Sequence, residues 1–165
     1  MRKIYLAGGC FWGMERALQI LDENIITTVG YANGKVENPS YERVCQGDTD
    51  FRETVEAVYD ENTVTLEKIL QVYFICVDPT AINRQGHDIG TQYQAGVYYC
   101  DEESRIICEN YFKQEQSKYD EFHVELKPLE NFYPGEEYHQ DYLIKNPQGY
   151  CHISLGQFDE IRKIK

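Results

Sequence analysis

The sequence predicts an α/β fold of the α+β class, built on a ferredoxin-like plait. Two observations lead to this prediction: apolar residues recur with strand and helix periods in turn, and the first six segments follow the order β-α-β-β-α-β. An added helix and strand, and then a loop-rich C-terminal tail, would decorate this core. The 165 residues correspond to about one domain. We therefore expect a single domain over residues 1–165, with an irregular tail over residues 146–165.

The first five elements follow from apolar spacing and turn residues. Gly8-Gly9 ends the first strand, the Asn33-Gly34 pair ends the second, and Thr65 is the expected N-cap of the second helix. In the two predicted helices, apolar residues recur at helical spacing. In the predicted strands, β-branched residues predominate or apolar and polar residues alternate. The predicted elements are a strand over residues 3–6, a helix over 11–21, a strand over 25–31, a strand over 54–59 and a helix over 66–74.

Long loops and four more elements complete the chain. Two polar stretches, residues 34–50 and residues 78–93, are expected to be long loops, and such loops in a compact domain are often functional. The tail from residue 148 onward is expected to lack regular structure. The remaining predicted elements are a strand over residues 95–100, a helix over 102–119, a strand over 122–126 and a last helix over 136–144.

Composition excludes several classes of function. The chain has 28 acidic and 16 basic residues, a formal net charge of −12, which argues against binding to nucleic acid or to an anionic membrane. No apolar run reaches the ~20 residues that span a bilayer, and the N-terminus lacks the body of a signal peptide. Six cysteines are too few for a disulfide scaffold at this length. We therefore expect a reduced, cytoplasmic protein.

One stretch points to thiol chemistry. Cys10 follows Gly8-Gly9, where the first predicted strand turns into the first predicted helix. The glycines allow a sharp turn and the start of a helix favours negative charge, so the sequence predicts a nucleophilic thiolate at Cys10. Phe11 and Trp12 would stand beside the sulfur as apolar walls. The alternative is a structural cysteine buried in a tight turn, but the glycines and the aromatic pair favour the functional interpretation.

Two other uses of cysteine receive little support. A hydrolase of the Cys-His type needs an imidazole base, and none of the four histidines has a local signature of that role. A metal site is not expected either, because no two cysteines are spaced as CxxC and no HxxH or HExxH motif occurs. The four histidines are His87, His123, His139 and His152.

The string Gly9-Cys10-Phe11-Trp12-Gly13 resembles the active-site motif of the A-type peptide methionine sulfoxide reductases. Four further motifs of that family have counterparts in this chain, in the same order. The resemblance runs from residue 4 to about residue 155 and so covers nearly the whole chain. The counterparts are Asn38-Pro39-Ser40-Tyr41-Glu42-Arg43-Val44-Cys45; Thr49 with Glu53; Gly86-His87-Asp88-Ile89-Gly90-Thr91-Gln92-Tyr93; and Tyr138-His139-Gln140-Asp141-Tyr142-Leu143 with Asn146-Pro147 and Gly149-Tyr150-Cys151.

The resemblance implies reduction of methionine-S-sulfoxide, free or in peptides and proteins, to methionine. It assigns Cys10 as the nucleophile that attacks the sulfoxide sulfur and Glu53 as the acid that protonates the oxygen. A carboxyl group holds a proton at neutral pH only if its pKa is raised, as in a pocket of low dielectric constant. Tyr41 and Tyr93 match the tyrosines whose hydroxyls hold the oxygen, and Asp88 matches a polar residue of the same pocket.

The resemblance also implies the rest of a catalytic cycle. Phe11 and Trp12 match the walls that receive the S-methyl group, and Cys151 matches the recycling cysteine carried by the tail. Attack would leave Cys10 as a sulfenic acid, which Cys151 would convert to a disulfide. A thioredoxin-like partner would reduce this disulfide, so no cofactor and no metal are expected. We further expect a monomeric catalytic domain that binds neither nucleic acid nor membrane.

Three features depart from the family pattern. Asp50-Phe51-Arg52 stands where Gly-His-Ala often precedes the acid, which changes the surroundings that tune its pKa. His87 stands where asparagine is more usual. Many relatives carry a further cysteine beyond the Gly-Tyr-Cys segment, but no cysteine follows Cys151 here. Either a two-cysteine cycle or direct reduction of the sulfenic acid by an external thiol is therefore expected.

Two other functions remain as alternatives. A thiol peroxidase or redox sensor would use Cys10 and Cys151 as well, but it would consume peroxide instead of a methyl sulfoxide. A plait-type ligand-binding domain would carry Cys10 as a structural residue, and slow, unselective labelling of Cys10 by iodoacetamide would favour it. The other cysteines are expected to be core residues (Cys76, Cys100 and Cys108) or are assigned no role (Cys45).

Overall fold

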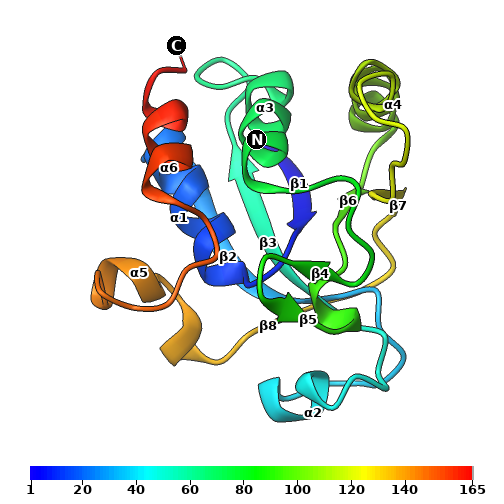
Figure 1. The fold of residues 1–165 in the computed structure, drawn as a ribbon, viewed down its shortest axis with the longest axis vertical. Helices are drawn as coiled ribbons and strands as arrows, with labels where there is room; N and C mark the ends of the chain where they lie inside the picture. The colour runs from blue at the N-terminus through cyan, green and yellow to red at the C-terminus, as the bar shows by residue number, and fades with distance from the viewer. Residues whose placement is uncertain (165) are drawn as a thin grey trace.

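The computed structural model describes residues 1–164, and six strands form its central sheet (Figure 1). These strands are β1 (Arg2–Ala7), β2 (Ile26–Ala32), β3 (Arg52–Tyr59), β6 (Gly96–Tyr99), β7 (Glu125–Pro128) and β8 (Phe132–Pro134). Two short strands, β4 (Arg84–Gln85) and β5 (Asp88–Ile89), form a separate hairpin. The helices are α1 (Phe11–Leu21), α2 (Tyr41–Cys45), α3 (Leu66–Cys76), α4 (Glu102–Gln116), α5 (Tyr142–Lys145) and α6 (Leu155–Arg162). Within residues 1–164, no helix combines the length and the apolar composition that crossing a membrane requires.

The central sheet has the strand order β7-β6-β1-β3-β2-β8. β1 pairs antiparallel with β3 and with β6, and β2 pairs antiparallel with β3. β7 extends one edge in parallel with β6, and β8 extends the other edge antiparallel to β2. Along β1, Ile4 and Leu6 belong to the main core, whereas Tyr5 and Ala7 belong to a small cluster of their own, as the period of two in a strand requires. The predicted mixture of helices with a sheet is confirmed.

Two long helices, α1 and α3, contribute to the main core and pack against each other. α1 buries Met14 and Leu18. α3 begins after Thr65, whose hydroxyl accepts a hydrogen bond from the Lys68 amide at 3.2 Å, so the predicted cap is confirmed. In Figure 1, α6 (red) lies beside α1 (blue), and α4 lies on the other side of α3. This packing fixes the start of α1 at the end of β1.

The C-terminal tail is not irregular, and the prediction for residues 146–165 is wrong in this respect because the tail contains α6. Ser154 and Gln157 form a capping box: the Ser154 hydroxyl accepts from the Gln157 amide at 3.2 Å, and Gln157 Oε1 accepts from the Ser154 amide at 2.8 Å. Phe158 and Ile161 are buried, and α6 contacts both α1 and α3. The short apolar stripe concealed this helix, although its capping residues are visible in the sequence. The tail is therefore docked onto the core.

The predicted helix over residues 136–144 is also wrong. The chain instead forms a 3-10 turn, η2 (Glu137–His139), followed by the four-residue helix α5. Asp141 lies between them in the left-handed conformation, with φ 53°, and a right-handed helix cannot continue through such a residue. The Asp141 amide donates to Oε1 of the buried Glu15 at 2.8 Å. This tertiary contact, which lies outside the local sequence pattern, stabilises the break.

Several other details differ from prediction. The stretch over residues 34–50, expected to be a loop, contains α2, which begins where the Ser40 hydroxyl accepts from the Arg43 amide at 3.1 Å. β8 was not predicted, and it depends on the edge of β2 for its hydrogen bonds. Cys76 and Cys108 are buried as expected, but Cys100 is exposed because it follows the end of β6. The predicted strands that correspond to β1, β2, β3 and β6 are unaffected by these differences.

Candidate active site

Cys10 lies at the junction of β1 and α1, and it is the N-cap residue of α1 without a side-chain capping bond. Gly9 precedes it with φ 77°, a left-handed conformation that glycine adopts without steric cost. A Cβ atom at Gly9 would lie 2.7 Å from the Cβ of Gln85, so the neighbouring hairpin also excludes a larger residue. The Gly9 amide donates to the carbonyl of Tyr93 at 3.3 Å. The turn is therefore held against the segment that carries Tyr93.

The Cys10 thiol is buried, with 5% of the residue exposed, and its pKa is raised. Burial is the main cause, and the negative charges of Glu53 and Asp88 add to it, whereas the Trp12 amide lowers the pKa. A helix N-terminus contributes about 0.3–1 kcal/mol, whereas burial can shift a pKa by several units of about 1.4 kcal/mol each. Burial therefore outweighs the helix and favours the neutral thiol over the thiolate that the helix start alone predicts. The sequence indicated that Cys10 lies at the start of a helix, but it did not indicate that the Cys10 side chain is buried.

Glu53 lies in β3 with 1% of its surface exposed. Its Oε1 accepts a hydrogen bond from the Phe11 amide at 3.2 Å, which places the carboxyl group beside the first turn of α1. Burial raises the pKa of Glu53 to about 8, the charge of Asp88 acts in the same direction, and the Phe11 amide opposes them. At neutral pH the group is therefore mostly protonated and able to donate a proton.

Tyr41 and Tyr93 lie within the electrostatic field of Glu53. Burial is the main cause that raises the pKa of each phenol, and the carboxylate charge of Glu53 raises it further. Both side chains are therefore neutral hydroxyl groups that can donate hydrogen bonds. The Tyr41 ring stacks on Phe11 with ring centres 6.3 Å apart. Two hydroxyl donors and one carboxylic acid thus belong to the same site as the Cys10 sulfur.

Asp88 lies in β5, where its two oxygens have different surroundings. Oδ1 accepts a hydrogen bond from the Tyr150 hydroxyl at 2.9 Å, and Oδ2 is buried without a partner. The negative charge of Asp88 also raises the pKa of Cys10 and the pKa of Glu53, so Asp88 lies close enough to interact with both groups. The residue connects the hairpin to the tail at this site.

Phe11 and Trp12 are surrounded by aromatic rings. The Trp12 ring stacks on Tyr142 with centres 3.8 Å apart, and its Nε1 donates to Nδ1 of His139 at 3.1 Å. His139 also lies against Phe11, with ring centres 5.2 Å apart. The aromatic pair therefore forms a packed apolar wall beside Cys10, whose far side is supported by η2 and α5.

Sequence reasoning assigned no site role to two histidines that the structure places here. His139 is 1% exposed, and because its Nδ1 accepts from Trp12, its proton is on Nε2, which has no partner. His152 is also buried, and neither of its ring nitrogens has a partner. The sequence offered one signal for each residue. His139 lies in the same motif as Tyr142, and His152 directly follows Cys151.

Unpartnered polar atoms gather at this site. Burying such an atom without a partner costs about 1–3 kcal/mol, so a group of them indicates a place prepared for a polar ligand. Within residues 1–164, the buried side-chain atoms without a hydrogen-bond partner are Glu53 Oε2, Asp88 Oδ2, Gln92 Oε1, His139 Nε2 and both ring nitrogens of His152. Most of them belong to the residues that surround Cys10.

Cys151 lies against the first turn of α1. A Cβ atom at Gly13 would be only 2.9 Å from the Cys151 sulfur, which accepts a weak hydrogen bond from the Ile153 amide at 3.4 Å. The charge of Cys151 contributes to the raised pKa of Cys10, so the two sulfurs are within electrostatic reach. The six cysteines, all within the described part of the chain, are free thiols. The docked tail therefore brings the predicted recycling thiol to the helix that begins at Cys10.

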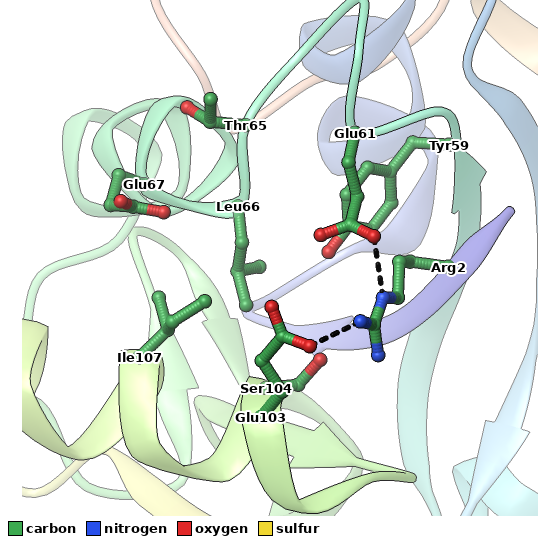
Figure 2. Close-up of a pocket in the computed structure, with 9 residues that line it drawn as sticks. All are labelled: Arg2, Tyr59, Glu61, Thr65, Leu66, Glu67, Glu103, Ser104 and Ile107. Atoms are coloured by element: carbon green, nitrogen blue, oxygen red, sulfur yellow. Dashed lines mark hydrogen bonds and ion pairs between the residues drawn. The ribbon is translucent and has the colours of Figure 1, made fainter.

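A cavity of about 220 Å³ lies at the opposite end of β1, and Figure 2 shows the residues that line it. Arg2 occupies it and pairs with Glu61 at 2.7 Å and with Glu103. Asp101 lies 3.3 Å from the same guanidinium group. The cationic group is therefore already neutralised, and none of the predicted site residues lines this cavity.

Within the described residues, no group of three or more His, Cys, Asp or Glu side chains is arranged to hold a metal ion. The expectation that no metal or cofactor is used stays a prediction.

The family model of peptide methionine sulfoxide reductases matches residues 2–164. The chain belongs to this family. The MsrA proteins of Clostridium acetobutylicum and Clostridium perfringens (strain 13) are peptide methionine sulfoxide reductases that are 54% and 49% identical to it. The matches cover 93% and 94% of this chain and 95% and 99% of those proteins. The resemblance in the sequence is therefore confirmed, and so is the prediction of an enzyme of the methionine sulfoxide reductase type.

Solved structures of this reductase family agree with the fold. Reduced Mxr1 from Saccharomyces cerevisiae has 40% sequence identity and a TM-score of 0.85, over 91% of this chain and 88% of that chain. Mxr1 in complex with Trx2 matches with a TM-score of 0.60 and 24% identity, over 86% of this chain and 84% of that chain. Because its sequence identity is only 24%, this second match supports the fold alone.

Proposed function

We propose that this chain reduces methionine-S-sulfoxide, free or in peptides and proteins, to methionine. The observation that carries the proposal is a proton-holding carboxyl group beside a buried thiol: Glu53 has a pKa of about 8, and its Oε1 is bound to the first helical amide after Cys10. A sulfoxide oxygen leaves sulfur only when it is protonated, so the reaction needs a nucleophile and an acid together.

In the proposed reaction, the Cys10 sulfur attacks the sulfoxide sulfur while Glu53 gives its proton to the oxygen. Attack joins the Cys10 sulfur to the substrate sulfur. The protonated oxygen then moves from the substrate sulfur to the Cys10 sulfur: the substrate's sulfur–oxygen bond and the new sulfur–sulfur bond break, a sulfur–oxygen bond forms on Cys10, and methionine leaves while Cys10 is left as a sulfenic acid. The proton lost from the Cys10 thiol replaces the proton that Glu53 gave. Since a negative charge on Glu53 raises the pKa of Cys10, a neutral Glu53 also makes the thiol easier to ionise.

Three different surfaces around the sulfoxide favour one epimer over the other, and the family resemblance assigns the S epimer. Tyr41 and Tyr93 offer hydroxyl donors to the oxygen, and Phe11 and Trp12 offer an apolar wall to the methyl group. The Cys10 sulfur approaches from the third direction. The opposite epimer would place its methyl group among the hydroxyls or its oxygen on the aromatic wall, and an oxygen there lacks its donors.

The two epimers provide the first test. Incubated separately with a small dithiol as reductant, the S epimer should be reduced and the R epimer should be left essentially untouched, with methionine measured by chromatography. Hydrogen peroxide serves as the third substrate. Comparable reduction of both epimers, or faster consumption of peroxide than of the S epimer, would contradict the proposal and favour a thiol peroxidase.

We further propose that Cys151 resolves the sulfenic acid and that a thioredoxin-like protein then reduces the Cys10–Cys151 disulfide. Cys151 is half-buried beside α1 and is one of the residues that line a cavity of about 450 Å³. Mxr1 has been solved with Trx2, and that complex is the kind of partnership proposed for this chain. The cycle needs no metal or cofactor, because the partner supplies both electrons.

Replacing Cys151 with serine separates the two routes of regeneration. Cys151→Ser should release about one methionine per enzyme with thioredoxin as reductant, because no disulfide can form for thioredoxin to attack. With a small dithiol, which reaches the sulfenic acid directly, the variant should continue to turn over. Cys100→Ser, a change at an exposed cysteine that follows β6, is the matched control and should cycle with both reductants. Equal multiple turnover of Cys151→Ser with thioredoxin would show that an external thiol resolves Cys10.

The proposal also covers the domain architecture, the oligomeric state and the location of the protein. We propose that residues 1–165 are one catalytic domain built on a ferredoxin-like plait, because β6, β1, β3 and β2 lie in this order and each is antiparallel to its neighbour. The monomeric state and the cytoplasmic location stay predictions.

A further inference from the structure

His152 follows the proposed recycling cysteine directly, and its side chain is only 4% exposed. Its imidazole lies against the backbone of the residue before Cys10: a Cβ atom at Gly9 would be 3.0 Å from both Cε1 and Nε2 of the ring. On the other side, Nδ1 lies 3.9 Å from Oδ2 of Asp88. The ring is therefore enclosed between the turn that holds Cys10, the β4–β5 hairpin and the tail.

Both ring nitrogens of His152 are buried without a hydrogen-bond partner. A buried histidine with a purely structural role normally binds at least one partner, because leaving it unpaired costs about 1–3 kcal/mol. Burial lowers the pKa of His152, and the nearby Asp88 opposes this without cancelling it. The imidazole is therefore neutral near pH 7, with one nitrogen free to accept a proton.

Formation of the disulfide needs a proton carrier at this place. Burial raises the pKa of the Cys151 thiol, so at neutral pH it does not ionise readily without a base. The hydroxyl of a sulfenic acid must in turn leave as water, which requires an acid. The reductive half of the reaction assigns Glu53 to the sulfoxide oxygen and leaves this second proton transfer without a residue.

We propose that His152 carries the proton in the step that joins Cys151 to Cys10. The imidazole takes the proton of the Cys151 thiol, and the Cys151 sulfur forms a bond with the Cys10 sulfur. The sulfur–oxygen bond of the sulfenic acid breaks, and the departing hydroxide takes the proton from the imidazolium and leaves as water. One thiol and one sulfenic acid thus give one disulfide and one water, without an external oxidant. The inference rests on the proposed function, since that function supplies the sulfenic acid.

The test follows the two steps separately in a single turnover without reductant. Methionine release reports the attack on the sulfoxide, and loss of free thiols, with dimedone trapping of the sulfenic acid, reports the disulfide step. In His152→Gln the ratio of the disulfide rate to the methionine-release rate should fall by about tenfold or more, as expected when a general base is removed. His123→Gln, at a half-exposed histidine beside Glu121, is the matched control and should keep the wild-type ratio.

The pH profile distinguishes a proton carrier from a packing role. In the wild type, the disulfide rate should be flat near neutral pH, because the imidazole is already neutral there. In His152→Gln it should rise about tenfold per pH unit, because the Cys151 thiol then depends on hydroxide. The charged group against this ring is Asp88 on β5, which also accepts a hydrogen bond from the Tyr150 hydroxyl of the tail, and the ring lies beside Gly9, the residue before Cys10.

Each outcome bears on one proposal. A wild-type ratio and a flat pH profile in His152→Gln would overturn the role of His152, while leaving the proposed function intact. If the wild-type enzyme releases no methionine and forms no sulfenic acid, the proposed function itself fails. If His152→Gln folds poorly, His152→Ala with added imidazole replaces it, and failure of imidazole to accelerate the disulfide step would count against the proposal.

Discussion

Cys10→Ser should abolish the reduction of methionine-S-sulfoxide, with a rate at least about a thousandfold below the wild type. A hydroxyl group is a far weaker nucleophile than a thiol, and burial disfavours its ionisation even more strongly than it disfavours that of the Cys10 thiol. The change removes the only atom proposed to bond to the substrate. The measurement is methionine released from the S epimer with a small dithiol, which bypasses the recycling thiol.

Cys100→Ser is the matched control for this prediction. Cys100 is exposed and follows the last residue of β6, whereas Tyr93 precedes the first residue of that strand, so replacement of Cys100 should leave the rate unchanged. Circular dichroism would show that both variants are folded. Retention of full activity by folded Cys10→Ser would mean that the sulfur at this turn is not the nucleophile, and it would favour the structural interpretation of the residue.

Glu53→Gln should slow the reduction by about 10²- to 10⁴-fold, with KM for the sulfoxide largely preserved. The amide keeps the shape and an oxygen for the Phe11 amide but has no proton to give to the substrate oxygen. In the wild type, the rate should fall as pH rises through about 8, because only the protonated carboxyl group acts as an acid. The variant should lack this decline.

A matched control is available on the same strand. Glu56 binds the Tyr5 hydroxyl at 2.6 Å outside the site, so Glu56→Gln should keep both the wild-type rate and its decline near pH 8. The prediction fails if Glu53→Gln reduces the sulfoxide at the wild-type rate, or if its rate still declines through pH 8. Either result would assign the acid to another group.

The same variant should also change how stability depends on pH. The folded pKa of Glu53 is raised from 4.5 to about 8, so between these values the unfolded chain has lost a proton that the folded chain keeps. The wild type therefore loses stability as pH rises from 4.5 to about 8. Glu53→Gln has no such loss and should be more stable than the wild type at pH 8, by roughly a few kcal/mol. Chemical denaturation at pH 5 and at pH 8 measures the difference.

Four strands of the sheet, β1, β2, β3 and β6, and the helices α1 and α3 were predictable because short-range patterns specify them. Alternation along β3, helical spacing along α1 and the Thr65 cap are local, and the structure has all of them. The C-terminal third was predicted poorly for the opposite reason. The left-handed Asp141 depends on its bond to Glu15, and α6 depends on the helices against which it packs. Such tertiary contacts leave no periodic signal.

The same distinction applies to the candidate site. Cys10 was found from its own neighbours, because two glycines and two aromatic residues mark the turn. Glu53 was found only through the family resemblance, since a glutamate at the start of a strand is more often exposed and its burial here is tertiary. His139 and His152 reach Cys10 only through the folding of the C-terminal segment. The resting charge of Cys10 could not be predicted for the same reason, because it depends on burial.

Trp12 is the only tryptophan of the chain, and its ring is stacked on Tyr142 and hydrogen-bonded to His139. All indole emission therefore comes from a single position in the molecule, one residue from the wall that Phe11 forms. A methyl group entering there, or a shift of α5, alters the surroundings of that one fluorophore. Binding of substrate beside Phe11 and Trp12, and the first turnover, can thus be followed by intrinsic fluorescence without an attached label.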